Sequence, residues 1–168
     1  MIVRYSQIIK SPVLLYQEQA VFGFVFDVVI QKSDIAVKAI VVRDRGLFYK
    51  QKLVSFHEIV AIESDSVTVQ KEESAVGADE APSIALAIGA GMAGSRRMVV
   101  TKNGKRVGLA YDYTIESESG LITSIYVKSW FSDRIIGREA ILSIEKRKII
   151  IDDDYELVKN SAALAEGN

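Results

Sequence analysis

The chain lacks the residue types on which many catalytic and metal sites depend. Its 168 residues include no cysteine and a single histidine, His57. The absence of cysteine excludes disulfides, thiolate nucleophiles and cysteine-ligated metals. A single histidine excludes paired-histidine chemistry, and no GxSxG motif surrounds His57, so we expect it to lie on the surface. We therefore predict no catalytic residue, no metal ion and no cofactor.

Ion-binding and phosphate-binding motifs are missing too. Asp152–Asp154 has neither the alternation nor the glycine of a calcium-binding EF-hand loop. Gly23 and Gly108 belong neither to GxGxxG nor to GxxxxGK[ST], so they do not indicate a phosphate cradle. A glycine early in a strand usually marks a bulge or a close backbone approach. We interpret both glycines as structural and the three acids as a solvated end of a strand.

The chain also lacks a long hydrophobic run. Its longest, IALAIGAGMAG from Ile84, has 11 residues, whereas a membrane helix needs about 20. The opening MIVRYSQIIKSPV has no apolar stretch of the kind found in signal peptides. We therefore expect no integral membrane segment and a cytoplasmic location.

What the chain does contain is a repeat of itself. FGFVFDVVI at Phe22–Ile30 matches VGLAYDYTI at Val107–Ile115, at a shift of 85 residues (from 22 to 107). IVAIESDSVTV from Ile59 matches ILSIEKRKIII from Ile141, at a shift of 82 residues (from 59 to 141). A self-similarity of this length indicates two copies of one small domain, with a three-residue difference in a loop. Domains this small are marginal alone, so we expect the copies to pack together or the chain to form a homo-oligomer.

Both copies have the pattern of β-structure. Short β-branched and apolar runs alternate with turn residues, as in small barrels and sandwiches. Asn103-Gly104, between VVT and RVGLAYDYTI, predicts a two-residue hairpin with a type I′ turn. We predict an all-β protein of two tandem small barrels joined by an Ala/Gly-rich linker. The predicted boundaries are 1–73 for the first domain, 74–94 for the linker with room for a short helix from Ile84, 95–154 for the second domain and 155–168 for a C-terminal tail.

The repeated segments resemble the PRC-barrel family, named for the cytoplasmic part of the photosynthetic reaction centre H subunit. Each copy has an opening segment (SQIIKSPVLL; SRRMVV), a Gly-x-x-x-Asp strand and a last segment, VSFHEIVAIESDSVTV or IGREAILSIEKRKIII. The family typically has a proline, an aromatic residue and an acid in that last segment. The first copy keeps Phe56 and Glu58 but has Ser55 at the proline, and the second has Gly137 and Arg138 instead.

The resemblance implies small PRC-like β-barrels that bind or assemble with other molecules and are not enzymes. Relatives include the H subunit and the C-terminal domain of the ribosome maturation factor. The implied partner is a protein, with RNA or the ribosome as an alternative. A peripheral subunit of a membrane or photosynthetic complex is a weaker alternative, and an enzyme site between the barrels is the weakest.

The repeat also duplicates a charged residue inside an apolar strand. Asp27 and Asp112 occupy equivalent positions, together with Gly23 and Gly108. A buried carboxylate is costly unless it accepts hydrogen bonds. Because both copies carry it, we expect a structural role, such as accepting backbone N–H bonds, rather than a catalytic pair.

Two segments mix basic and aromatic residues at the same place in each copy, RDRGLFYKQK from Arg43 and VKSWFSDR from Val127. Trp, Tyr and Arg dominate protein interfaces, and aromatic residues flanked by cations also stack single-stranded nucleic acid. Packing of the aromatic residues in the core, with the basic side chains outside, is the interpretation that we favour over both. The candidate partner-binding residues are Phe48, Tyr49, Trp130, Phe131 and Arg134.

Charge is distributed unevenly along the chain, although the net charge is −1. Residues 95–151 carry eleven Lys/Arg and six Asp/Glu, whereas the tail from Asp152 carries one Lys and five acids. A basic domain beside an acidic tail can mark a nucleic-acid or ribosome contact or a tail that folds back, but charge this modest more often marks a solvated face. Under the RNA alternative, the candidate contacts are Arg96, Arg97, Lys105, Arg106, Lys146, Arg147 and Lys148.

Overall fold

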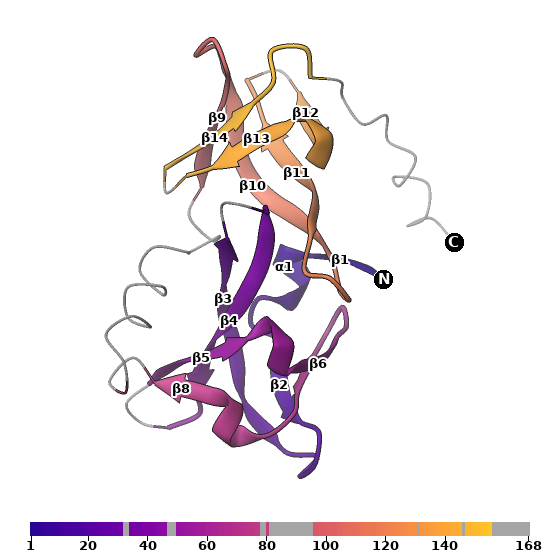
Figure 1. Cartoon of the computed structure of the whole chain (residues 1–168), viewed down its shortest axis with the longest axis vertical. Coiled ribbons are helices and arrows are strands. Elements are labelled where there is room, and N and C mark those ends of the chain that lie inside the picture. Colours follow the sequence, from indigo (N-terminus) through magenta and orange to yellow (C-terminus); the bar gives the residue numbers. More distant parts are fainter. Residues whose placement is uncertain are drawn as a thin grey trace.

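The computed structural model is mostly β, as expected, and contains two curled sheets that stack along the long axis of the molecule (Figure 1). It describes residues 1–31, 34–46, 50–77, 80, 96–130, 132–145 and 147–155. Among these residues, no helix has the length and apolar character needed to cross a membrane.

The first sheet is built from the first copy of the repeat. Its strand order is β6-β7-β2-β3-β4-β5-β8, and neighbours are antiparallel except for β2 and β7. The long central strand β3 pairs along most of its length with β4, which places alternate residues in the core. The bounds are β2 (Pro12–Leu15), β3 (Val21–Gln31), β4 (Ala36–Asp44), β5 (Gln51–Ser55), η1 (Phe56–Glu58), β6 (Ile59–Ile62), β7 (Val67–Val69), η2 (Glu72–Ser74) and β8 (Ala75–Gly77).

The second sheet repeats this path with the second copy. Its order is β12-β11-β10-β9-β14-β13, with β9 and β14 parallel as β2 and β7 are in the first sheet. Even the β-bulges recur, between Val25 and Asp27 in β3 and between Ala110 and Asp112 in β10. The bounds are β9 (Arg97–Thr101), β10 (Arg106–Glu116), β11 (Ile122–Lys128), β12 (Asp133–Gly137), η3 (Arg138–Ala140), β13 (Ile141–Ile144) and β14 (Lys148–Ile151).

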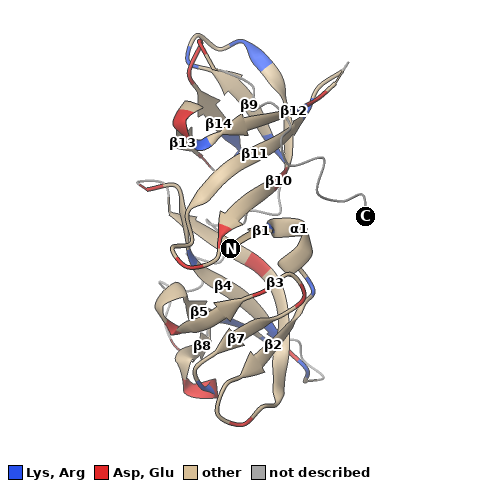
Figure 2. Cartoon of the chain, turned by 90° about the vertical axis from the view of Figure 1, so that its right-hand side faces the viewer, with Lys and Arg blue, Asp and Glu red and all other residues tan. Residues whose placement is uncertain are grey.

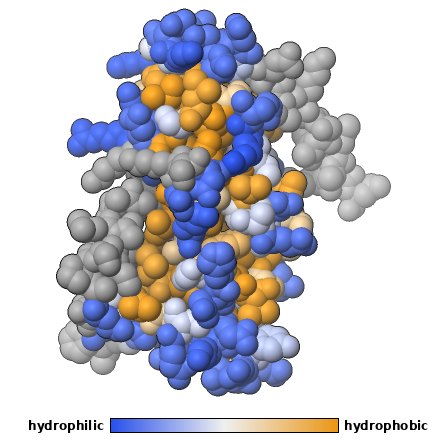
Figure 3. Space-filling view, in the orientation of Figure 1, coloured by the Kyte–Doolittle hydropathy of each residue, from blue (hydrophilic) through white to orange (hydrophobic). Residues whose placement is uncertain are grey.

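The segment expected to be a linker begins with structure. Ala75–Gly77 forms β8, which pairs with β5 at the edge of the first sheet. The expected short helix from Ile84 lies outside the described residues. Apolar surface is exposed over both sheets and is bordered by hydrophilic side chains (Figure 3).

The hairpin between β9 and β10 differs from the predicted type I′ turn. Only Gly104 has a positive φ, of 84°, whereas a type I′ turn would need one at Asn103 as well. The Gly104 N–H donates to the Thr101 carbonyl (2.8 Å), and the Thr101 N–H donates to the Lys105 carbonyl (2.9 Å). This is a three-residue loop with glycine at its left-handed position, and the prediction of a two-residue turn was wrong.

The N-terminal segment crosses from one sheet to the other. β1 (Ile2–Arg4) pairs antiparallel with β10 in the second sheet, and the chain then passes through α1 (Tyr5–Ile8) into β2 of the first sheet. Acidic positions on β3 and β10 lie beside α1 at this junction (Figure 2). The first residues of the expected first domain are therefore hydrogen-bonded to the second copy.

The hairpin tips of the two copies also bind each other. The Val37 N–H donates to the Gly120 carbonyl (2.8 Å), and the Ile122 N–H donates to the Ile35 carbonyl (3.0 Å). These bonds are equivalent under the 85-residue shift, which relates Ile35 to Gly120. Both residues have positive φ angles, 51° and 73°. The buried side chains of the two sheets form one continuous hydrophobic core.

Candidate binding surfaces

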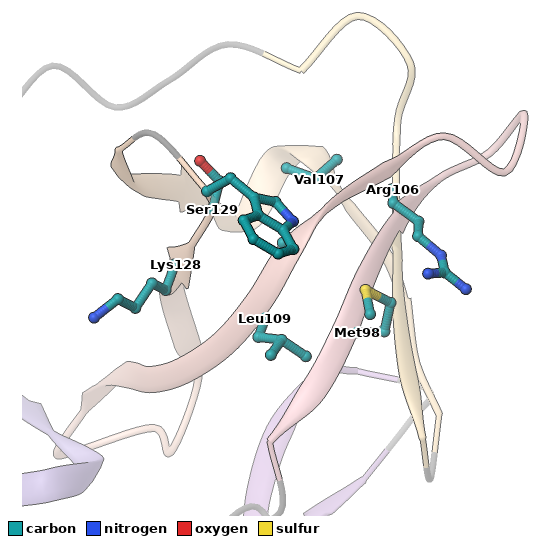
Figure 4. Close-up of a pocket in the computed structure, with 8 residues that line it drawn as sticks. Met98, Arg106, Val107, Leu109, Lys128 and Ser129 are labelled. Carbon is teal, nitrogen blue, oxygen red and sulfur yellow. The ribbon is translucent and has the colours of Figure 1, made fainter.

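An exposed tryptophan stands beside an apolar groove on the second sheet. Trp130, in the loop after β11, has 98% of its surface exposed. The groove has a volume of about 530 Å3, and its lining combines apolar residues of β9 and β10 with cations at the rim (Figure 4). The lining residues are Met98, Arg106, Val107, Gly108, Leu109, Lys128, Ser129 and Trp130.

Gly108 sets the shape of this groove. A Cβ at this position would come within 2.8 Å of Val127 Cγ1 and closer still to the Lys128 carbonyl oxygen. The missing side chain therefore lets β10 lie close to β11 at this position. On the other side of β10, its pairing with β9 shifts register between Arg106 and Gly108. Leu109, on the opposite face of the strand from buried Ala110, is 38% exposed.

A second hollow continues the surface along β10. It has a volume of about 370 Å3 and shares Leu109 and Lys128 with the groove. The Tyr111 ring meets the Tyr126 ring edge-on, with centroids 6.0 Å apart. Partial burial and then the Asp133 carboxylate raise the pKa of the Tyr111 hydroxyl. The lining of this second hollow also includes Arg96, Tyr111 and Asp133.

The candidates from the aromatic segments have different outcomes. Trp130 is not a core residue, so the core-packing interpretation does not hold there. Arg134 is half-buried, donates to the Tyr155 hydroxyl (2.9 Å) and lines neither hollow. The remaining three candidates, Phe48, Tyr49 and Phe131, lie outside the described residues.

The basic residues of the RNA alternative do not form one surface. Arg97 is 2% exposed, and its guanidinium donates to the Glu145 carbonyl (2.9 Å) and the Tyr113 hydroxyl (3.1 Å). Lys148 forms an ion pair with Glu145 (3.7 Å). Arg96, just before β9, and Arg106, the first residue of β10, are exposed and line one hollow each. Lys105 and Arg147 are exposed but line neither hollow, and Lys146 is outside the described residues.

Asp27 and Asp112 hold the N-terminal helix at the junction. Both are buried, and each accepts the N–H of the next residue. Asp112 also accepts the Ser6 N–H (3.0 Å) and hydroxyl (2.6 Å), while Asp27 accepts the Tyr5 hydroxyl (3.1 Å). Burial, and then Asp27, raises the pKa of Tyr5. Every buried polar side-chain atom among the described residues has a hydrogen-bond partner. We therefore interpret this cluster as a structural contact that holds α1 against the two sheets.

Sequence reasoning missed most of the groove lining. Met98, Leu109 and Lys128 come from three adjacent strands, and the register between those strands brings them together. The available signal was the alternation in β10, where Leu109 and Tyr111 occupy the face opposite the buried Ala110 and Asp112. Two large apolar residues on the solvent face of a strand indicate a surface that another molecule could cover.

Neither a metal site nor a known relative identifies this surface. Among the described residues, no three His, Asp or Glu side chains lie close enough together to hold a metal ion. No protein-family model matches the chain, and no curated protein is significantly similar to it in sequence.

Proposed function

We propose that this protein is a non-enzymatic binding module that attaches a partner protein to the groove beside Trp130. We also propose that each copy of the repeat is a small barrel of the PRC type, so that the chain carries two of them. The observation that carries the function is the near-complete exposure of Trp130 beside a groove with an apolar floor.

The exposed indole of Trp130 leaves apolar surface in contact with water, which is unfavourable, and a partner that covers it would remove this cost. Burying a large apolar side chain stabilises a complex by about 1.5–3 kcal/mol. Tryptophan and arginine are also enriched among the residues that dominate binding energy. Trp130 and Leu109 would supply apolar anchors, and Arg106 would supply a directional charge at the rim.

RNA binding is the main competing function. Arg96, Arg106 and Lys128 surround the aromatic surface, and none of them forms an ion pair with a carboxylate among the described residues. The burial of Arg97 and the ion pair of Lys148 leave these cations without a continuous basic track. We therefore favour a protein partner.

The test is a pull-down with tagged protein from an extract of the source cells, with and without nuclease. We expect Trp130→Ala to lose a nuclease-resistant protein. The matched control is Tyr16→Ala, because Tyr16 is also an exposed aromatic residue, at 60%, and lies in the turn after β2 of the first sheet. Retention of every captured protein by Trp130→Ala would contradict the proposal, and capture that disappears with nuclease would favour RNA.

A further inference from the structure

The first sheet carries a groove at positions that partly match the two hollows of the second sheet. It has a volume of about 380 Å3, and its Phe26 corresponds to Tyr111, which lines the second hollow and not the groove beside Trp130. The 85-residue shift relates Phe24 to Leu109 and Arg43 to Lys128, and these four residues line the two grooves. Phe24 is 41% exposed and Leu109 is 38% exposed, so both anchors are equally accessible.

A glycine at the same position in each copy lets two strands lie close together beside each groove. A Cβ at Gly23 would come within 2.9 Å of Val42 Cγ1 and closer still to the Arg43 carbonyl oxygen. This matches the contacts that a Cβ at Gly108 would make with Val127 and Lys128. In each sheet the close approach brings the cation of the neighbouring strand beside the exposed apolar residue that follows the glycine.

The charges of the two grooves also agree. Lys10 and Arg43 line the first groove, and Arg106 and Lys128 line the second. Among the described residues, no carboxylate lines either groove, and Asp133 lines the second hollow that adjoins the groove beside Trp130. The Arg43 guanidinium lies 3.6 Å from the centroid of the Phe26 ring, which holds its charge over the apolar floor. A ligand complementary to both grooves combines a large apolar group with negative charge.

The floors favour a peptide over a nucleic acid. Met98, Val107 and Leu109 in one groove and Ile9 and Val25 in the other are aliphatic, and they suit an aliphatic or aromatic side chain. Trp130 adds one ring to the first of these grooves, and Phe24 and Phe26 add two to the other. A nucleic-acid site would also need a track of cations for successive phosphates. Each groove instead offers two cations around one apolar hollow.

We propose that both grooves bind the same class of ligand, a short acidic peptide segment with a large apolar side chain, so that one chain holds two such segments. This inference rests on the proposed function for the groove beside Trp130 and extends it to a second site. Two linked sites would give a bivalent partner an avidity well above the affinity of either groove.

The experiment titrates the 15N-labelled full chain with the capped hexapeptide Asp-Glu-Leu-Leu-Asp-Glu. We expect the amide signals of Phe24 and Leu109 to shift together, with two peptides bound per chain. Arg43→Glu should weaken binding at Phe24 by about tenfold or more and leave Leu109 unaffected, and Lys128→Glu should do the reverse. Phe24→Ala is the second variant for the first groove if Arg43→Glu disturbs the fold.

Each alternative result has a distinct meaning. Shifts confined to the Leu109 side would overturn the second site and leave the proposed function standing. An equal response to Lys-Lys-Leu-Leu-Lys-Lys, or no response to the acidic peptide, would overturn the ligand chemistry. If the partner captured in extracts still depended on Trp130 in that case, the proposed function would survive. Shifts at both grooves with a uridine hexanucleotide and not with the peptide would assign the sites to RNA.

Discussion

Replacing Arg138 by methionine tests how the two sheets are held together. The Arg138 guanidinium donates to three backbone carbonyls, those of Ile35 (2.8 Å), Ile122 (3.3 Å) and Asp34. Ile35 and Asp34 belong to the hairpin of the first sheet, whereas Arg138 follows the last residue of β12 in the second. Methionine keeps a stem of similar length and removes all three donors.

The expected loss is large for a single half-buried side chain. A hydrogen bond from a charged donor contributes about 1.5–3 kcal/mol. The three bonds share one guanidinium and one of them is long, so we expect a total loss of about 3 kcal/mol. Arg138 also stabilises a hairpin in which Ile35 has a positive φ, a conformation that costs an L-residue about 1–2 kcal/mol.

Urea unfolding followed by circular dichroism measures this loss. Tryptophan fluorescence would be a poor reporter, because Trp130 is already exposed in the folded protein. Arg147→Met is the matched control, since Arg147 is exposed, and it should change the free energy of unfolding by less than about 0.5 kcal/mol. A similarly small change for Arg138→Met would refute the reasoning and show that the guanidinium contributes little to joining the sheets.

Three further predictions concern the repeat, the junction and the groove. Gly23→Ala and Gly108→Ala should each lower the free energy of unfolding by about 1–3 kcal/mol, because the Cβ overlaps the neighbouring strand. Gly46→Ala is their control, since its Cβ would meet only the Asp44 side chain, and equal effects in urea unfolding would contradict the close approach. Burial and Asp27 raise the pKa of Tyr5 above its ordinary value of about 10, so the stability from this group is complete below that pH and falls as pH rises. The melting temperature of Tyr5→Phe should therefore decline less steeply than that of the wild type above about pH 10, and an equally steep decline would argue against the assignment. Trp130→Ala should change the free energy of unfolding by less than about 0.5 kcal/mol, and a larger loss in a urea titration would place the indole in a structural role.

The local sequence pattern predicted much of the fold. The expected strand at Phe22–Ile30 lies within β3, and its repeat at Val107–Ile115 lies within β10. The repeat could be found because each copy must bury the same alternating face and make the same turns. The repeat also favoured a structural role for Asp27 and Asp112. The hydrogen bonds that they accept from Tyr5 and Ser6 of α1 could not be predicted from it, because these contacts differ between the two copies.

The remaining features depend on partners distant in the chain. Nothing in Ile2–Arg4 distinguishes a strand of the first sheet from one that pairs with β10. The two-residue turn was wrong because Asn103 supports more than one loop type, and the register of β9 on β10 decides between them. The mixture of basic and aromatic residues made Trp130 a candidate, but its exposure and the groove beside it depend on how β9, β10 and β11 align.

The pairing of β1 with β10 has a consequence for biosynthesis. Val3 lies opposite Ile115, so the first strand meets a partner made 112 residues later (115 − 3). At about 5–20 residues per second, a ribosome would take roughly 6–22 s to supply that partner. During this interval the first sheet can assemble while β1, which belongs to the second sheet, stays unpaired and open to chaperones or to other nascent chains. The pairing of β1 with β10 is therefore a contact of large sequence separation, and such contacts form slowly.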